Sequence, residues 1–133
     1  MAQTSSLDGV TDVSLTEELL LLTLEDTGGE FDSVPEIYLN CGIAGAALMD
    51  LSLRGKLDSD LSGVFVVDPS STGDVTLDLV LASIAREPER LSAGEWIARL
   101  SHDAPAMREA ALAHLCARGV LRQKDHAFLW ALN

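Results

Sequence analysis

Apolar residues recur at helical spacing along most of the chain, beginning near its N-terminus. The first such segment, Leu15 to Leu24, is dense in leucine and is preceded by Ser14, with Glu17 three residues after that serine. This spacing is typical of a capping box, in which the serine and the glutamate each satisfy a backbone N–H at the start of a helix. The pattern therefore predicts a helix over Leu15 to Leu24.

The second segment, Val34 to Arg54, is apolar on nearly every side of a helix, and Gly55 follows it in the position of a C-terminal cap. A helix that is apolar all round is buried inside a domain. We therefore expect this helix at the centre of the core. Its apolar residues fall on two stripes: Ile37, Cys41, Ala44, Leu48 and Leu51 on one, and Ile43, Ala46 and Ala47 on another.

The rest of the chain predicts shorter elements. Ser92 and Glu95 repeat the capping-box spacing before a short helix that carries Trp96, Ile97 and Leu100. Gly119 is placed to end the helix Pro105 to Arg118. The other expected elements are strands Leu57 to Leu61 and Val64 to Val67 with a turn at Ser62 and Gly63, helices Asp74 to Arg86 and Pro105 to Arg118, and a hairpin of Val120 to Leu121 with Ala127 to Leu132. The predicted fold class is mostly α (α+β): one compact helical domain with a buried central helix and short β-hairpins at its ends.

The length of 133 residues and a hydrophobic content of 47% indicate one folded domain. Residues 1–13 are polar and acidic and are expected to form a flexible tail, so the domain is assigned to residues 14–133. This beginning does not resemble a secretory signal. The longest apolar run, Cys41 to Met49, is also far shorter than the ~20 residues of a membrane span. We therefore expect a cytoplasmic protein.

The charge of the chain argues against a nucleic-acid partner. The formal net charge is −12, and residues 1–85 hold 15 acidic side chains against only Arg54 and Lys56. Residues 86–133 hold seven basic and six acidic side chains, so an anion site belongs in this last third. Duplex nucleic acid would be repelled unless a basic face were segregated from the acidic surface.

Motifs for catalysis or metal binding are absent from the sequence. His114 and Cys116 are two residues apart on one predicted helix and would point to different faces, and no second pair completes a tetrahedral set. There is no G-x-S-x-G elbow, and Cys41 lies in an apolar segment with no nearby base. We therefore expect both cysteines to be reduced and structural, and we expect no catalytic residue, no metal and no cofactor.

Four blocks of sequence carry a resemblance to a known family. They are LTEELLLL (15–22), GIAGAALMDLSLRGKL (42–57), TGDV (72–75) and RGVL (118–121). In this order they resemble the Golgi phosphoprotein 3 family, whose eukaryotic members are phosphoinositide-binding adaptors for Golgi enzymes. The resemblance covers about Ser14 to Leu132. It implies a largely helical single domain without enzymatic activity. The basic residues are seven arginines and two lysines, which fits a bacterial member of the family.

The resemblance also points to candidate lipid-binding positions. Family members that bind phosphatidylinositol 4-phosphate hold its head group with a tryptophan before the second helix, an arginine within it and two arginines on a later helix. The corresponding residues here are Pro35, Ala44, Pro105 and Arg108, so only Arg108 matches. Because phosphate recognition needs several donors together, any head-group binding is expected to be weak. The alternative for Arg108, four residues before the inward Leu112, is an arginine that extends from the edge of the core to solvent.

The end of the chain is the candidate interface. Family domains continue with further helices after this hairpin, so the chain is expected to be a naturally short or a truncated member that lacks them. Four apolar residues then lose neighbours that the family would supply: Phe128, Leu129, Trp130 and Leu132. We expect self-association or contact with a protein partner through this hairpin. The alternative is a monomer in which Trp130 folds back on its own helices.

Together these observations predict a non-enzymatic binding or adaptor module that acts through protein contacts and weakly, as a peripheral protein, at an anionic membrane. The runner-up is a winged-helix DNA-binding regulator, because a helix ended by glycine and followed by a hairpin is also how that module ends. Its recognition helix would be Pro105 to Arg118. Arg108, Arg118 and His114, with Glu109 among them, offer little charge for neutralising phosphates.

Overall fold

The computed structural model describes residues 13–23, 35–124 and 127–130. The predicted tail lies outside these residues except for Val13, which packs against the core. Within the described part the chain forms helices and two hairpins in this order: α2 (Leu15–Thr23), α3 (Glu36–Leu53), β1 (Leu57–Asp60), β2 (Gly63–Val66), α4 (Val75–Arg86), α5 (Ala93–Leu100), α6 (Ala104–Ala117), β3 (Leu121–Lys124) and β4 (Ala127–Trp130). The predicted class, mostly helical α+β, is confirmed.

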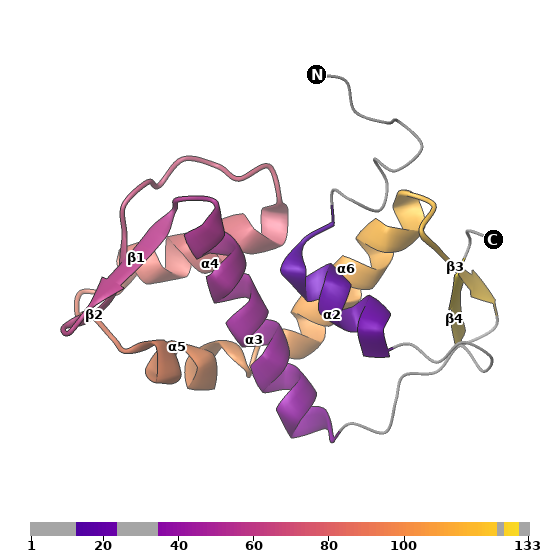
Figure 1. The fold of residues 1–133 in the computed structure, drawn as a ribbon, viewed down its shortest axis with the longest axis horizontal. Helices are drawn as coiled ribbons and strands as arrows, with labels where there is room; N and C mark the ends of the chain where they lie inside the picture. The colour runs from indigo at the N-terminus through magenta and orange to yellow at the C-terminus, as the bar shows by residue number, and fades with distance from the viewer. Residues whose placement is uncertain (1–12, 24–34, 125–126, 131–133) are drawn as a thin grey trace.

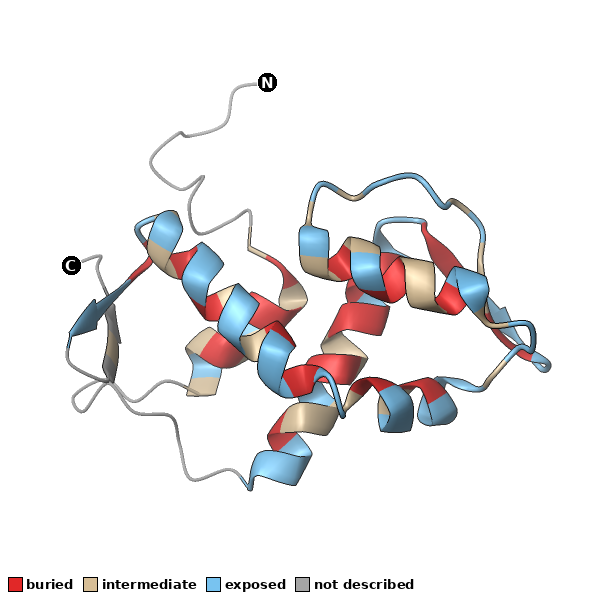
Figure 2. Cartoon of the chain, turned by 180° about the vertical axis from the view of Figure 1, so that it is seen from behind, coloured by how far each residue is buried: buried red, intermediate tan, exposed pale blue. Residues whose placement is uncertain are grey.

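The second predicted helix is the centre of the fold. α3 contacts α2, α4, α5, α6 and β1, and the hairpins lie at opposite ends of the molecule, β1–β2 at one end and β3–β4 at the other (Figure 1). The buried side chains form one hydrophobic core that includes residues from every helix (Figure 2). A central α3 with hairpins at the ends is the arrangement that the sequence predicts.

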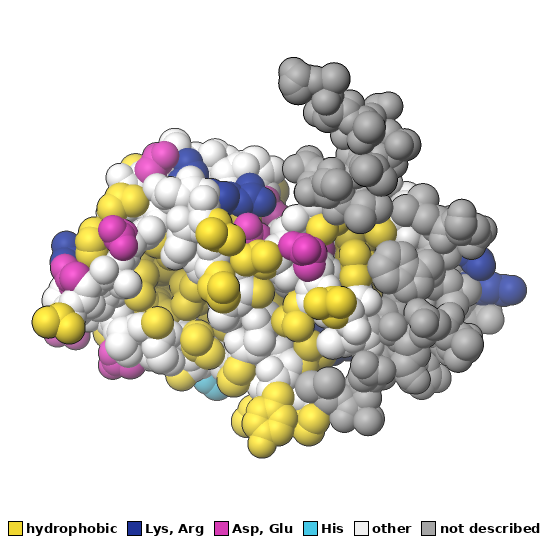
Figure 3. All heavy atoms as spheres, in the orientation of Figure 1, with side chains coloured by type: hydrophobic (Ala, Val, Ile, Leu, Met, Phe, Trp, Pro, Cys, Tyr) yellow, Lys and Arg dark blue, Asp and Glu magenta, His cyan; other side chains and the backbone are white. Residues whose placement is uncertain are grey.

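Only one side of α3 is buried, which corrects part of the expectation for this helix. Ile43, Ala44, Ala47 and Leu51 are fully enclosed, but Ile37, on the first predicted stripe of a helix expected to be buried, is 67% exposed. The opposite side of the helix is also apolar and open to solvent, and yellow hydrophobic atoms gather over α3 in Figure 3. When a helix is apolar on all sides, its neighbours decide which side becomes buried. The periodicity of the helix itself does not predict that side.

Side-chain caps fix where the helices begin. The capping boxes predicted at Ser14 with Glu17 and at Ser92 with Glu95 are both present, each serine Oγ accepting the glutamate N–H and each glutamate Oε1 accepting the serine N–H. The carboxylate of Asp74 accepts the Leu77 N–H, 3.1 Å away, and so caps α4. These local contacts satisfy N–H groups that a helix cannot satisfy itself.

The hairpin β1–β2 turns one residue earlier than predicted. Leu57 pairs with Val66 and Asp60 pairs with Gly63, so the connection is Leu61 and Ser62, and Gly63 lies inside β2. Gly63 has φ +129, and a Cβ there would lie 2.6 Å from the Leu91 carbonyl oxygen. This close approach, next to the hydrogen bond from the Val64 N–H to the same oxygen, requires glycine and ties the hairpin to the α4–α5 loop.

The predicted C-terminal hairpin is also present. β3 and β4 are antiparallel, with Leu121 opposite Trp130 and Gln123 opposite Phe128. Leu121 is buried, and Phe128 is half-buried against the core. β3 follows α6 directly and packs against it, so α6 and the core position the hairpin. The final predicted residue of the cluster, Leu132, lies outside the described residues.

Candidate functional site

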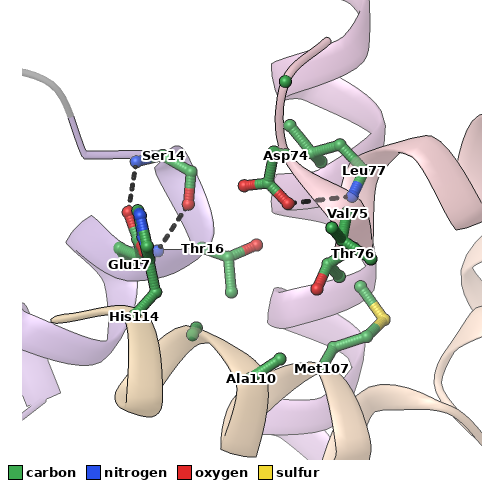
Figure 4. Close-up of a pocket in the computed structure, with 12 residues that line it drawn as sticks. Ser14, Thr16, Glu17, Asp74, Val75, Thr76, Leu77, Met107, Ala110 and His114 are labelled. Carbon is green, nitrogen blue, oxygen red and sulfur yellow. Dashed lines mark hydrogen bonds and ion pairs between the residues drawn. The ribbon is translucent and has the colours of Figure 1, made fainter. Parts of the chain in front are cut away.

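A cleft of about 250 Å³ opens where the first turns of α2 and α4 meet one face of α6 (Figure 4). Its apolar wall includes Leu77 from α4 and Met107 and Ala111 from α6. Polar side chains come from all three helices: Ser14, Thr16, Glu17, Asp74, Thr76 and His114. Three segments that are distant in the sequence thus supply one concave site, which is the usual setting of a ligand or partner contact.

Glu17 is the buried polar centre of one wall. Its side chain is 3% exposed, and its Oε1 accepts the Ser14 N–H in the capping box. Its Oε2 lies 2.5 Å from Nδ1 of His114, and the two side chains share a hydrogen bond. Glu17 therefore both caps α2 and joins α2 to α6.

A second carboxylate holds the start of α2 against the central helix. Asp50 of α3 is 6% exposed, and its Oδ2 accepts the Leu15 N–H at 3.1 Å. Its Oδ1 lies 3.4 Å from Nε of Arg54, one helical turn later. Asp50 thus satisfies a backbone N–H of α2 from a different helix, and it fixes the first turn of α2 at the cleft.

The opposite wall is positioned by the loop before α4. Asp78 accepts hydrogen bonds from the hydroxyls of Ser71 and Thr72 and from the Thr72 N–H, and these bonds hold the pKa of Asp78 below its usual value. This ordered loop places Asp74, and Thr76 in the first turn of α4, at the cleft. In Figure 4 the side chains of Thr16, Asp74 and Thr76 point into the space between the helices.

The chemistry of the cleft is that of hydrogen-bond acceptors. Its lining includes the carboxylates of Glu17 and Asp74 and several hydroxyls, whereas its lining contains no lysine or arginine. A phosphate group placed there would be repelled by the two carboxylates, and His114 is already paired with one of them. The Ser14 hydroxyl contacts the Glu17 N–H, so the described contacts do not join a serine nucleophile to the histidine.

The positions that correspond to the lipid-binding residues of the family do not form this cleft. Ala44 is 0% exposed in the core and cannot contact a ligand. Pro35 precedes α3 and Pro105 lies in the first turn of α6, and both are exposed. Arg108, in the second turn of α6, is half-buried and makes contacts within the domain.

The Lys56 side chain and its partners form a separate polar cluster beside the first hairpin. Nζ of Lys56, a buried residue, lies 2.8 Å from the Ser70 hydroxyl and 3.1 Å from Oδ2 of Asp68. Hydrogen bonds from the Ser70 side chain and backbone, together with Lys56, lower the pKa of Asp68 to about 2. These contacts order the loop that follows β2.

The two cysteines and the grouping of titratable side chains bear on metal binding. Cys41 and Cys116 are unpaired thiols and are half-buried, and burial raises the pKa of the Cys116 thiol. Over residues 13–23, 35–124 and 127–130, no three His, Cys, Asp or Glu side chains come together in a way that could hold a metal ion. In the same part of the chain, no helix is both long and apolar enough to cross a membrane.

Sequence reasoning missed the contacts that build the cleft. It assigned Glu17 a capping role, which is correct, but gave no sign of its pairing with His114, and it did not single out Asp50. The one available signal for Asp50 was a charged residue inside an otherwise apolar helical segment. For His114 there was none, because its partner lies 97 residues away.

Comparison with known protein families identifies the chain. Its residues 15–133 match the model of the family described as Golgi phosphoprotein 3 (GPP34). The chain belongs to this family. The match begins at the first residue of α2 and covers α3, both hairpins and the lining of the cleft except Ser14. The whole described fold except Val13 and Ser14 therefore falls within the Golgi phosphoprotein 3 domain. Membership indicates a binding or adaptor role of the kind that characterises the family.

Proposed function

We propose that this Golgi phosphoprotein 3 family member is a non-enzymatic binding module that acts through contact with another polypeptide at its C-terminal hairpin. A second copy of the chain is one such polypeptide. Contact with an anionic membrane is expected to be peripheral and weak. The observation that carries the proposal is the position and pairing of β4.

In the described part of the chain, β4 pairs with β3 alone. The other edge of a strand in a two-stranded sheet presents backbone N–H and C=O groups to which a further strand can be added. The hairpin lies at one end of the molecule, away from β1–β2 (Figure 1). Phe128 packs it against the core. A strand held in this way is already ordered before it meets a partner, which lowers the entropic cost of binding.

The residues at the family's lipid-binding positions argue against a phosphoinositide head group as the main ligand. Of the four positions that the family uses for this purpose, Ala44 is enclosed in the core and Pro35 and Pro105 offer no side-chain donor. A single exposed arginine–phosphate contact is worth little in water. Of these four positions only Arg108 carries a side-chain donor, so we expect any membrane contact to respond to overall lipid charge rather than to a particular head group.

Sedimentation tests the role of the hairpin. We expect wild-type protein to associate across ~1 to 100 μM, a range chosen for weak self-association, and we expect Trp130→Ser to lower the average mass. The matched control is Leu61→Ser, which changes an exposed leucine at the connection of the other hairpin and should leave the mass unchanged. A wild-type chain that stays monomeric over this range, or a Trp130→Ser protein that associates as wild type does, would refute self-association through the hairpin.

A further inference from the structure

The cleft between α2, α4 and α6 continues along α4 and α6 as an apolar groove of about 370 Å³. The residues that line both parts are Val75, Thr76, Met107 and Ala110. Cleft and groove together, called the hollow below, therefore have a polar end and an apolar end. Leu79, which lines the groove only, is 66% exposed. A site of this shape suits a small ligand that has one polar group and an aliphatic part.

Thr16, in the first turn of α2, presents a buried hydroxyl to the polar end of the hollow. The residue is only 7% exposed, and its side chain points into the space between the helices (Figure 4). Among the described residues, no hydrogen bond involves its Oγ1. Buried polar groups in folded proteins are nearly always paired. A hydroxyl that is nine-tenths buried, unpaired and aimed into a cleft is therefore placed to receive a ligand.

The facing wall supplies two more oxygens with unused capacity. Oδ1 of Asp74 accepts the Leu77 N–H, and the other carboxylate oxygen, which points toward the α2 side in Figure 4, has no partner among the described residues. The Thr76 hydroxyl also points into the hollow, and the described contacts give it no partner either. Thr16, Asp74 and Thr76 thus offer three acceptors at one end. A primary ammonium group has three N–H donors and no acceptor.

The charges around the hollow favour a cation. In the described part of the chain neither cleft nor groove is lined by lysine or arginine, and Asp103 lies in the lining of the groove. The N-terminus of α4 contributes roughly half a positive charge, which is less than the full negative charge of the Asp74 that caps it. Glu17 offsets the N-terminus of α2 in the same way. Because the chain also carries a formal charge of −12, the hollow attracts cations and repels anions.

We propose that the hollow binds a small aliphatic primary amine in its protonated form. The ammonium group donates to the oxygens of Thr16, Asp74 and Thr76, and the aliphatic stem lies in the groove against Leu79 and Met107. No described residue of the hairpin β3–β4 lines the hollow. The amine site therefore does not depend on the hairpin proposal, and either can fail without the other.

An NMR titration of the full-length protein with hexylamine tests the ligand class. At pH 7 this amine is protonated, because alkyl ammonium groups have pKa values near 10. We expect saturable shifts of backbone amide signals at the start of α2, along α4 and on the facing side of α6. Hexyltrimethylammonium has the same charge and stem but no N–H donor, and 1-hexanol has the stem without the charge. We expect both to bind at least about tenfold more weakly, because hydrogen bonds to charged groups are the stronger kind.

Equal affinity for the two cations would overturn the proposal, because it would show only general attraction of positive charge to an acidic protein. Saturable shifts confined to another part of the molecule would overturn it as well, since the ligand would then occupy a different site.

Two conservative variants test the residues. Thr16→Val removes the hydroxyl and keeps the shape of the side chain, whereas Asp74→Asn removes the charge and keeps a residue that caps helices equally well. We expect each to lower the affinity for hexylammonium about tenfold. Asp58→Asn is the matched control, since it removes the same charge from an exposed position in β1 and should bind as wild type does. Affinities of Thr16→Val and Asp74→Asn equal to that of Asp58→Asn would overturn the proposal.

The melting temperature of Thr16→Val separates a ligand-binding role from a structural one. A buried hydroxyl without a partner does not stabilise the fold, so its replacement by a methyl group should leave the melting temperature unchanged or raise it. A clearly lower melting temperature would show that the hydroxyl already has a partner within the protein, and this result would also overturn the proposal.

Discussion

Nδ1 of His114 lies 2.5 Å from Oε2 of Glu17, so a hydrogen bond joins α6 to α2 across 97 residues of sequence. Glu17 is the more buried partner, with 3% of its side chain exposed against 48% for His114. A carboxylate so deeply enclosed is stable only when its oxygens are hydrogen-bonded. The pair therefore fixes the wall of the cleft, and we expect it to stabilise the folded protein.

We expect His114→Ala to lower the free energy of unfolding by about 1–3 kcal/mol, because it leaves a buried carboxylate oxygen without its partner. His102→Ala is the matched control, since His102 is exposed in the turn between α5 and α6. Its effect should stay within about 0.5 kcal/mol. Urea denaturation of both variants measures the difference. If both variants unfold at the same urea midpoint as wild type, the Glu17–His114 hydrogen bond does not stabilise the packing of α2 on α6.

The buried side of α3 gives a second prediction. Leu48 is 7% exposed in the core, and Leu48→Asp would place an unpaired charge there. We expect a loss of several kcal/mol and no soluble folded protein. Leu61→Asp makes the same change at a fully exposed position and should fold normally. A Leu48→Asp protein that melts within a few degrees of wild type would show that this side of α3 does not form the core.

The Asp68 cluster predicts how stability depends on acid. The folded-state pKa of Asp68 is about 2, well below the ordinary value of an aspartate side chain, so the ionised form is favoured in the fold. A lowered pKa stabilises the protein fully above the unfolded value, and this stabilisation is lost as the pH falls toward 2. We therefore expect Asp68→Asn to be less stable than wild type near neutral pH, with the difference shrinking between pH 4 and pH 2. Urea denaturation of both proteins between pH 4 and pH 2 measures this difference in stability. A difference that does not change with pH would contradict the prediction.

DNA binding separates the adaptor account from the winged-helix alternative. The surface of α6 that would enter a major groove exposes Glu109 and several alanines, while Arg108 and Arg118 are half-buried. We expect duplex DNA to bind no more tightly than ~10⁻⁴ M at physiological salt, the weak limit of non-specific binding. Gel-shift titration measures this affinity. Micromolar, sequence-dependent binding would favour the winged-helix alternative.

Local signals in the sequence predict the elements of this fold well. Ser14 with Glu17 and Ser92 with Glu95 locate two helix starts within a residue, because a capping box is completed by residues three positions apart. Gly55 and Gly119 adopt positive φ after α3 and α6, as their positions at the helix ends predict. In each case the information is contained within one turn of chain.

Features that depend on distant partners were not predictable in the same way. The exposure of Ile37 and the burial of Leu39 depend on which side of α3 is covered by other helices, and an apolar pattern is nearly identical on both sides. The hydrogen bond between Glu17 and His114 requires the packing of α2 on α6. The cleft, which combines three helices, could therefore be located only in the folded structure, whereas Arg108 and the hairpin could be named from the sequence.

Vesicle flotation tests most directly the central claim that this family member acts through polypeptide contact rather than through a phosphoinositide head group. Vesicles with phosphatidylinositol 4-phosphate are compared with vesicles brought to the same net charge with phosphatidylserine, using wild type and Arg108→Ala. We predict weak flotation that is equal for the two compositions and is abolished by salt. Flotation that is several-fold stronger with phosphatidylinositol 4-phosphate, and that is lost in Arg108→Ala, would contradict the account.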